Sequence, residues 1–265
     1  MGKGGKFSSS LSIGNFFKVV LVFQVLSLVV IVGAPQKFLD ENINGNNFSI
    51  NEPEVGNDYY NNQRRKFTDN SIPVPRKIPG RFPFSIKLPD SFSKRLEFRE
   101  VSLPSVGKGL LVSGEIAEGD ANRFKQELQN YDSDQLQFIA IHSPGGNVDE
   151  ALNIGIKIRQ DGLHTVLSKS STCLSACPYI FASGVKRIKA STAYIGVHQS
   201  YYEENLVLPL YFAVEDIQKS QADSFRHLRK MNINADIMEH ILDTPPDEIY
   251  ILNEKELTKF NLVTH

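Results

Sequence analysis

Residues 171–199 read STCLSACPYIFASGVKRIKASTAYIGVHQ and decide how the rest of the chain is interpreted. This stretch places Ser175 on a turn of small residues, directly before an apolar run that Pro178 opens. A strand-like segment follows, and then a second one at 193–197, which ends at His198. A serine before a helix and a histidine at the end of a strand are the components of a nucleophile and its general base.

Around this stretch, short apolar runs alternate with segments whose apolar residues recur at helical spacing. The pattern predicts strands at 109–116, 136–141, 165–168, 185–189, 193–197 and 249–252, and helices at 120–131, 148–160, 212–231, 235–242 and 254–261. A further helix is predicted directly after the serine turn. Strand–helix alternation with short loops predicts βαβ units and a mainly parallel sheet, in an α/β domain that we place at 97–265.

Three features fall at the carboxyl ends of predicted strands, where sites of parallel α/β sheets collect. Gly145 and Gly146 follow one strand and precede a helix, Ser175 follows another, and His198 ends a third. Backbone amides at Gly146 and at Ala176 are placed to point at a developing oxyanion. Taken singly, the glycines are typical of a tight turn, the serine of a helix cap and the histidine of a satisfied polar residue. The order of these three features along the predicted strands and helices favours a catalytic site.

The chain has two cysteines, Cys173 and Cys177, which flank Ser175. We interpret them as free thiols that pack as small apolar side chains at the start of a helix. The alternative is a bridge, which an oxidising compartment allows. On a helix, a separation of four residues lies near the upper limit of Cα distance for a disulfide, so such a bridge would be labile. The pair would then be a redox gate on the nucleophile turn.

The N-terminal segment 1–35 is basic and then apolar, which is typical of an export signal or a membrane anchor. No acidic residue precedes Asp40, and 19–34 is apolar apart from Gln24 and Ser27. We favour an uncleaved signal-anchor that crosses the membrane with residues 13–34, and a cleaved signal peptide is the alternative. Either leaves the rest of the chain outside the cytoplasm. Segment 36–96 is rich in asparagine and proline and predicts a polar linker, or at most a strap lying over the domain.

Composition excludes one class of partner. The net charge is −1 and the pI is near 6.6, so no overall basic field favours nucleic acid. Nucleic acid is therefore not an expected partner of this chain.

The motifs SPGGNV, CLSAC-PYIFASG and R-x₈-GVHQ resemble, in this order, the proteolytic subunit of the Clp protease. The resemblance covers 110–263 and is strongest to poorly characterised exported, periplasmic relatives within the ClpP/crotonase superfamily. It implies a ClpP/crotonase-like fold of repeated β-β-α or βαβ units. It also implies that Ser175 is the nucleophile, that His198 is its base, and that the Gly145–Gly146 turn and Ala176 form the oxyanion hole. No cofactor is implied.

The third member of a catalytic triad is less well defined. The family's aspartate precedes the C-terminal strand and helix, and counting back from that helix gives Ile249, which is not an acid. A small local shift makes Asp247 the acid that orients His198, with Glu248 and Asp243 as neighbours. A Ser–His dyad and an inactive descendant both stay open.

The resemblance implies an exported serine peptidase, tethered to the bacterial inner membrane with its catalytic domain on the periplasmic side. Its expected substrates are peptides, unfolded proteins or segments released from the membrane. An ATP-dependent unfoldase is not expected as a partner, since that compartment lacks ATP, whereas assembly into rings or trimers is implied by the fold.

Three alternatives compete with this function. The first is an inactive module that binds peptides or supports an assembly. The second is an enzyme like the signal-peptide peptidases, which use a Ser–Lys pair, with Lys219 or Lys230 as the base. The third, acyl-CoA chemistry as in crotonases, is disfavoured by export and by the serine–histidine pair.

Overall fold

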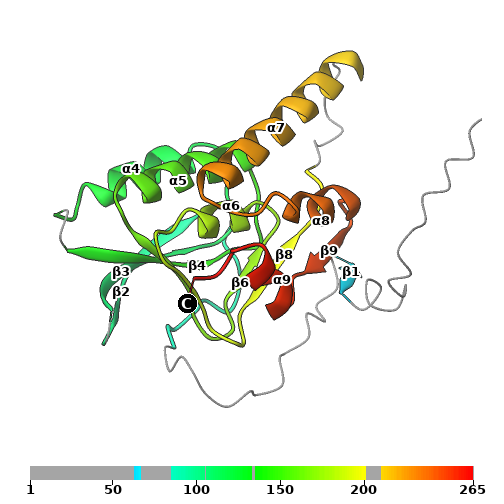
Figure 1. Cartoon of the computed structure of the whole chain (residues 1–265). Helices are drawn as coiled ribbons and strands as arrows, with labels where there is room; N and C mark the ends of the chain where they lie inside the picture. The colour runs from blue at the N-terminus through cyan, green and yellow to red at the C-terminus, as the bar shows by residue number, and fades with distance from the viewer. Residues whose placement is uncertain (1–62, 67–84, 105, 133–134, 201–209, 265) are drawn as a thin grey trace, which may run out of the picture. The chain divides into compact units, whose positions relative to one another are not determined.

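The structure is a computed structural model, and it describes residues 63–66, 85–104, 106–132, 135–200 and 210–264 (Figure 1). All of them belong to one compact unit, Gly56–His265. The predicted membrane segment, 13–34, lies outside the described residues. Across the described stretches of the chain, no helix is long and apolar enough to cross a bilayer.

Five strands form the larger sheet, in the order β2-β3-β4-β5-β7. Their bounds are β2 Glu97–Leu103, β3 Gly107–Ser113, β4 Leu136–His142, β5 His164–Leu167 and β7 Arg187–Lys189. The β2 strand pairs with β3 in antiparallel register, and every other pair in this sheet is parallel. The α/β class and the mainly parallel sheet are therefore confirmed.

Four strands form a second sheet, in the order β1-β9-β8-β6. Their bounds are β1 Arg64–Lys66, β6 Thr172–Leu174, β8 Tyr194–Val197 and β9 Glu248–Ile251. The edge strand β6 pairs with β8 in parallel register, and β9 and then β1 are added on the other side of β8 in antiparallel register. The β1 strand lies within the predicted linker, so this short piece of it does act as a strap on the domain.

The sequence pattern did not predict three of the described strands or the division into two sheets. The strands β1, β2 and the three-residue β6 were missed, and β6 separates the serine turn from the strand at His164–Leu167 that was expected to carry it. The chain passes from β5 in the larger sheet to β6 in the smaller one and then into a helix, and it repeats this path from β7 through β8. The serine and the histidine therefore follow neighbouring strands of the smaller sheet.

The helices are α4 Asp120–Leu128, α5 Val148–Gln160, α6 Cys177–Ala182, α7 Leu210–Lys230, α8 Ile237–Asp243 and α9 Glu254–Lys259. Helix α5 begins where predicted because Asn147 caps it, its side chain accepting a hydrogen bond from the amide of Glu150. Helix α9 begins with a capping box between Asn253 and Glu256. The first turns of α7 extend away from the body of the domain (Figure 1).

The larger sheet is apolar on both faces. Leu110 and Val112 of β3 belong to the main core with α4 and α5, whereas Leu111 between them joins a smaller cluster on the opposite face. Phe138 of β4 lies in that second cluster, directly over Gly109, where an added Cβ would be 2.4 Å from its ring. Burial on both faces explains why β3 and β4 are nearly continuous apolar runs instead of alternating ones.

Candidate active site

Ser175 lies on a sharp turn between β6 and α6. Its φ angle is 58°, in the left-handed region that costs a residue with a side chain about 1–2 kcal/mol. The amide of Ser175 donates to the carbonyl of Gly196 on β8 at 3.0 Å, which anchors the turn to the neighbouring strand. A strained strand-to-helix turn of this kind presents a serine hydroxyl at the end of a sheet.

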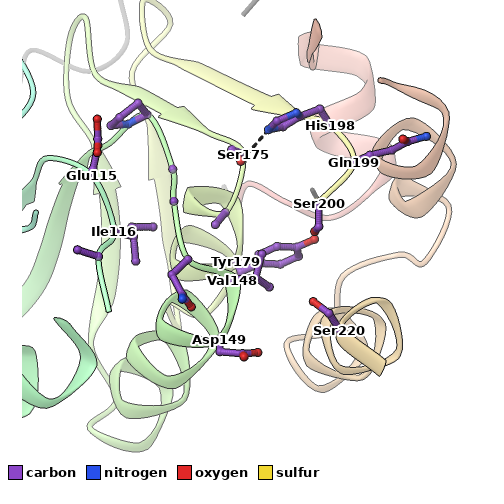
Figure 2. A pocket seen from close by; sticks show the side chains of 16 residues that line it. Glu115, Ile116, Val148, Asp149, Ser175, Tyr179, His198, Gln199, Ser200 and Ser220 are labelled. Atoms are coloured by element: carbon purple, nitrogen blue, oxygen red, sulfur yellow. Dashed lines mark hydrogen bonds between the residues drawn. The ribbon is translucent and has the colours of Figure 1, made fainter. Parts of the chain in front are cut away.

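His198 follows β8 and faces this turn. Its Nε2 lies 2.7 Å from Ser175 Oγ (Figure 2). On the other side of the ring, Nδ1 lies 3.0 Å from the carbonyl of Pro246, which can only accept, so Nδ1 carries the proton. Nε2 is then the free base that accepts from the serine hydroxyl. Burial lowers the pKa of His198, and the bond to Pro246 partly opposes this effect, so the ring is neutral near pH 7.

The glycine turn contacts the serine turn. Gly145 and Gly146 have φ angles of 106° and 136°, which glycine adopts without strain. An added Cβ on Gly145 would lie 2.4 Å from Ser175 Cβ, and one on Gly146 would lie 2.3 Å from the carbonyl oxygen of Ile116. Within the described residues, no hydrogen bond uses the amide of Gly146 or of Ala176. As far as the described residues extend, these two backbone donors are therefore available near the serine.

Serine, histidine and glycine turn line one cavity of about 510 Å³. Its wall is built by Glu115, Ile116, Ala117, Pro144, Gly145, Gly146, Asn147, Val148, Asp149, Ser175, Ala176, Tyr179, His198, Gln199, Ser200 and Ser220. Figure 2 shows Asp149 at the start of α5 and Ser220 on α7 beyond it. Both charged side chains in this wall are acidic, and both are exposed to solvent.

The three acids considered for the triad lie around Pro246. Asp247 is the next residue, exposed in the turn before β9, and Glu248 begins that strand. Asp243, at the end of α8, forms an ion pair with Arg64 of β1. The contact that the structure defines at His198 Nδ1 is the backbone carbonyl, and the assignment of Asp247 as the orienting acid stays a prediction.

The two lysines considered as alternative bases lie away from the site. Lys219 and Lys230 are exposed on α7, and neither lines the cavity. A lysine base has to be desolvated and within hydrogen-bond reach of the hydroxyl. The hydroxyl of Ser175 is instead bonded to His198.

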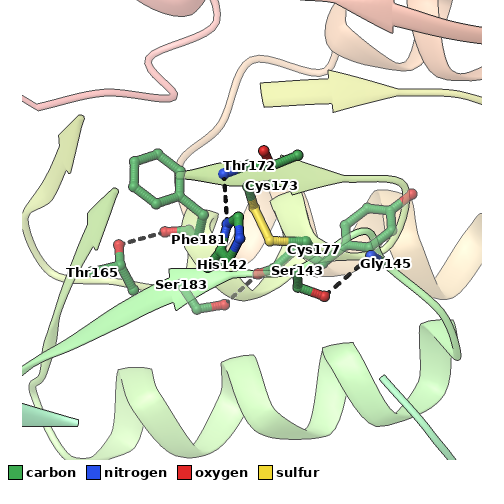
Figure 3. The surroundings of a disulfide bond; sticks show 10 residues. His142, Ser143, Gly145, Thr165, Thr172, Cys173, Cys177, Phe181 and Ser183 are labelled. Atoms are coloured by element: carbon green, nitrogen blue, oxygen red, sulfur yellow. Dashed lines mark hydrogen bonds between the residues drawn. A yellow bond between two sulfur atoms is a disulfide. The ribbon is translucent and has the colours of Figure 1, made fainter. Parts of the chain in front are cut away.

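The expectation that Cys173 and Cys177 are free thiols is wrong, because they form a disulfide (Figure 3). The spacing argument assumed that both residues lie on a helix. Cys173 lies on β6 and only Cys177 on α6, so the turn between them brings the Cα atoms to 5.1 Å, within the usual range for a bridge.

Sequence reasoning missed His142, which supports the site from behind. It ends β4, its ring packs on Phe92 with 4.6 Å between centroids, and its Nδ1 accepts the amide hydrogen of Thr172 at 3.0 Å. Burial lowers the pKa of His142 to about 4. Its position at a strand end, directly before Ser143 and the glycine turn, was the available signal. The carbonyl of Pro246 was also missed, because a backbone acceptor has no sequence signature.

No family model and no curated protein matches this chain. In the part of the chain that the structure describes, no group of three or more His, Cys, Asp or Glu side chains is placed to hold a metal ion.

Proposed function

We propose that this chain is an exported, membrane-tethered serine peptidase with a ClpP/crotonase-like fold, acting on peptides or on unfolded or membrane-released segments. The observation that carries the proposal is the 2.7 Å contact between Ser175 Oγ and His198 Nε2 in the wall of a cavity. An isolated helix-capping serine has no need of a buried neutral histidine, whereas a nucleophile does.

The topology supports the finer fold assignment. One repeating unit consists of a strand in the larger sheet, a strand in the smaller sheet and a helix. It occurs as β5-β6-α6 and again as β7-β8-α7, although residues between β8 and α7 lie outside the described ranges. Isolated parallel bridges link Ser143 to Cys173 and Ile116 to Gly146, so the preceding segments also run toward the smaller sheet. Successive turns of one spiral are the expectation for the ClpP/crotonase class.

The proposed reaction uses this chain's own groups. His198 Nε2 takes the proton of Ser175 as Oγ attacks the peptide carbonyl, whose electron pair moves onto its oxygen. The amides of Gly146 and Ala176 receive that oxyanion. The imidazolium returns the proton to the departing amine as the C–N bond breaks, and the acyl-enzyme is hydrolysed by water through the same histidine. The Pro246 carbonyl keeps the ring in the required tautomer.

The compartment and the assembly belong to the same proposal. A disulfide beside Ser175 supports a location on the periplasmic side of the membrane, since bridges persist in oxidising compartments. Anchoring through residues 13–34 and assembly into a homo-oligomer are proposals that follow from the resemblance.

A fluorophosphonate probe tests the nucleophile in the full chain, purified in detergent. We expect Ser175 to be labelled, and both Ser175→Ala and His198→Gln to abolish labelling. The matched control is Ser200→Ala, since Ser200 lines the same cavity without bonding to His198, and it should label as the parent does. A folded, disulfide-bonded protein that never labels would remove the proposal.

A second function to be distinguished is a peptide-binding module without turnover, in which the same cavity holds a peptide that Ser175 does not cleave. Fluorescence anisotropy with a mixed peptide library distinguishes the two. Binding that Ser175→Ala leaves unchanged, together with no cleavage by the parent over days, supports the module.

A further inference from the structure

The Cys173–Cys177 disulfide encloses the proposed nucleophile. Cys173 lies two residues before Ser175 on β6, and Cys177 two residues after it as the first residue of α6. Both cysteine side chains are completely buried. Figure 3 shows the bridge beside His142, the last residue of β4, and Ser143, which follows it and leads into the glycine turn. The bridge thus closes a short loop, Cys173 to Cys177, that contains the serine turn.

The backbone hydrogen bonds that tie this turn to other segments of the described chain lie before the serine. Before the serine, the amide of Leu174 donates to the carbonyl of Ser143 at 3.1 Å, and the amide of Ser175 donates to Gly196. After the serine, the amide of Ala176 makes no hydrogen bond within the described residues, and its carbonyl accepts only from the amide of Tyr179, within the start of α6, at 3.2 Å. An amide that has to stay free for an oxyanion cannot also fasten the turn. The disulfide fastens the chain on that side.

The turn also needs to be held because its conformation is unfavourable. The φ angle of 58° at Ser175 costs about 1–2 kcal/mol, and a chain without restraint relaxes toward negative φ. Relaxation would rotate the Cα–Cβ bond and carry Oγ away from His198 Nε2. A displacement of about 1 Å lowers the rate of a positioned reaction by roughly a hundredfold.

We infer that the Cys173–Cys177 disulfide is the positioning element for Ser175 and makes the proposed activity conditional on an oxidising compartment. This inference rests on the proposed function. Before export both residues are thiols. Forming the S–S bond removes two protons and two electrons, which a disulfide-bearing thiol oxidant accepts as its own bridge becomes two thiols. The nucleophile is then held in place only after the chain has left the reducing cytoplasm.

Breaking the bridge therefore slows Ser175 without unfolding the domain. A dithiol returns two electrons and two protons, and the two unbonded sulfur atoms have to separate. Since both lie in the packed core, β6 or the start of α6 shifts to make room, and the serine turn joins these two elements.

The test compares the rate of fluorophosphonate labelling in four forms of the full chain in detergent. These are the oxidised protein, the protein reduced with dithiothreitol, the reoxidised protein, and the double variant Cys173→Ala/Cys177→Ala. Mass spectrometry after alkylation verifies the thiol state. We expect labelling at least about tenfold slower after reduction, recovery on reoxidation, and a slow double variant that dithiothreitol does not affect.

A matched control separates positioning from a general loss of stability. Ile158→Val removes a methyl group from the core on α5, which costs about 0.5–1.5 kcal/mol, and should leave labelling unchanged. A pH profile adds a second readout. In the oxidised protein the labelling rate should follow the titration of His198, and in the double variant this dependence should flatten, because the serine no longer bonds to the ring.

Hydrogen exchange decides the inference independently of activity. Reduction should accelerate exchange in a peptide covering 172–178 and leave the central strand β4 unchanged. If the oxidised protein never labels, the proposed function fails, and acceleration confined to 172–178 still supports the bridge as the element that holds the turn. Verified reduction that changes neither labelling nor exchange overturns the inference.

Discussion

Acidification through the pKa of His142 is expected to weaken the domain, because the folded protein holds this ring neutral. The ring is 8% exposed, and its Nδ1 can accept the amide hydrogen of Thr172 only when unprotonated. Burial lowers the pKa from 6.5 to about 4. As the pH falls, the unfolded chain binds a proton near 6.5 and the folded chain only near 4. The stability from this group is therefore full above the unfolded pKa and lost as the pH falls toward the folded one.

The size of the effect follows from that difference in pKa. Each pKa unit corresponds to about 1.36 kcal/mol, so the full loss in the free energy of unfolding is about 3 kcal/mol. About 2 kcal/mol of this loss falls between roughly pH 7 and pH 4.5. A domain of this kind has a free energy of unfolding of about 5–15 kcal/mol. The loss is thus large enough to measure by chemical denaturation.

His142→Asn isolates this contribution, since the side-chain oxygen of asparagine can take the place of Nδ1 as acceptor and does not titrate. Unfolding by urea at roughly pH 7 and pH 4.5 should show that the free energy of unfolding falls by about 2 kcal/mol more in the parent than in the variant. Other buried histidines whose pKa is lowered, His198, His227 and His240, titrate in both proteins, so their effects cancel. Equal losses in parent and variant would refute the reasoning.

Three further predictions concern the cavity and use labelling or cleavage rates. Gly146→Ala should slow labelling by at least about a hundredfold, because its Cβ would lie 2.3 Å from a backbone oxygen and displace an oxyanion donor. The control is Gly162→Ala, which is also at positive φ but whose Cβ would have no described atom within 4 Å, and it should not slow labelling. Asp247→Asn should slow labelling, by up to about ten-thousandfold as in a triad, because a carboxylate stabilises the imidazolium; a loss of less than about tenfold would contradict the assignment of Asp247 and leave the Pro246 carbonyl as the group that orients the ring. Asp149→Asn should reduce a preference for basic over acidic peptides by about two- to fivefold, an effect that added salt should diminish; no change at low salt would count against it.

The parts of the fold that the sequence predicted are those defined by local patterns. Helix α5 was placed from Val148 to Gln160 because its apolar spacing and its cap lie within consecutive residues. The strand β4 was found because burial on both faces makes it a continuous apolar run. By contrast, β6 has three residues, too few for a periodic signal, and it exists because it pairs with β8 about twenty residues later.

The candidate site divides in the same way. Ser175, His198 and the glycine pair carry side-chain or glycine signals whose order along the chain reveals them. The acceptor at His198 Nδ1 is a backbone carbonyl, and any residue in the turn at Pro246 would supply it equally well. The disulfide was misjudged because its geometry depends on a strand-to-helix turn between the cysteines, which spacing alone does not specify.

A single junction between β4 and β6 holds both halves of the candidate site. Ser143 donates its amide hydrogen to the Thr172 carbonyl at 2.8 Å and accepts from the Leu174 amide, while its hydroxyl accepts from the amide of Gly145 at 3.1 Å. The amide of Thr172 is in turn held by His142. The strand that carries the nucleophile and the turn that carries an oxyanion donor are thereby fastened to the same residue. Protonating His142 and reducing the disulfide perturb this junction from opposite sides, so each should slow labelling of Ser175 at conditions where circular dichroism still reports a folded domain. Labelling that declines only in step with global unfolding would show instead that the junction does not transmit these perturbations to the serine.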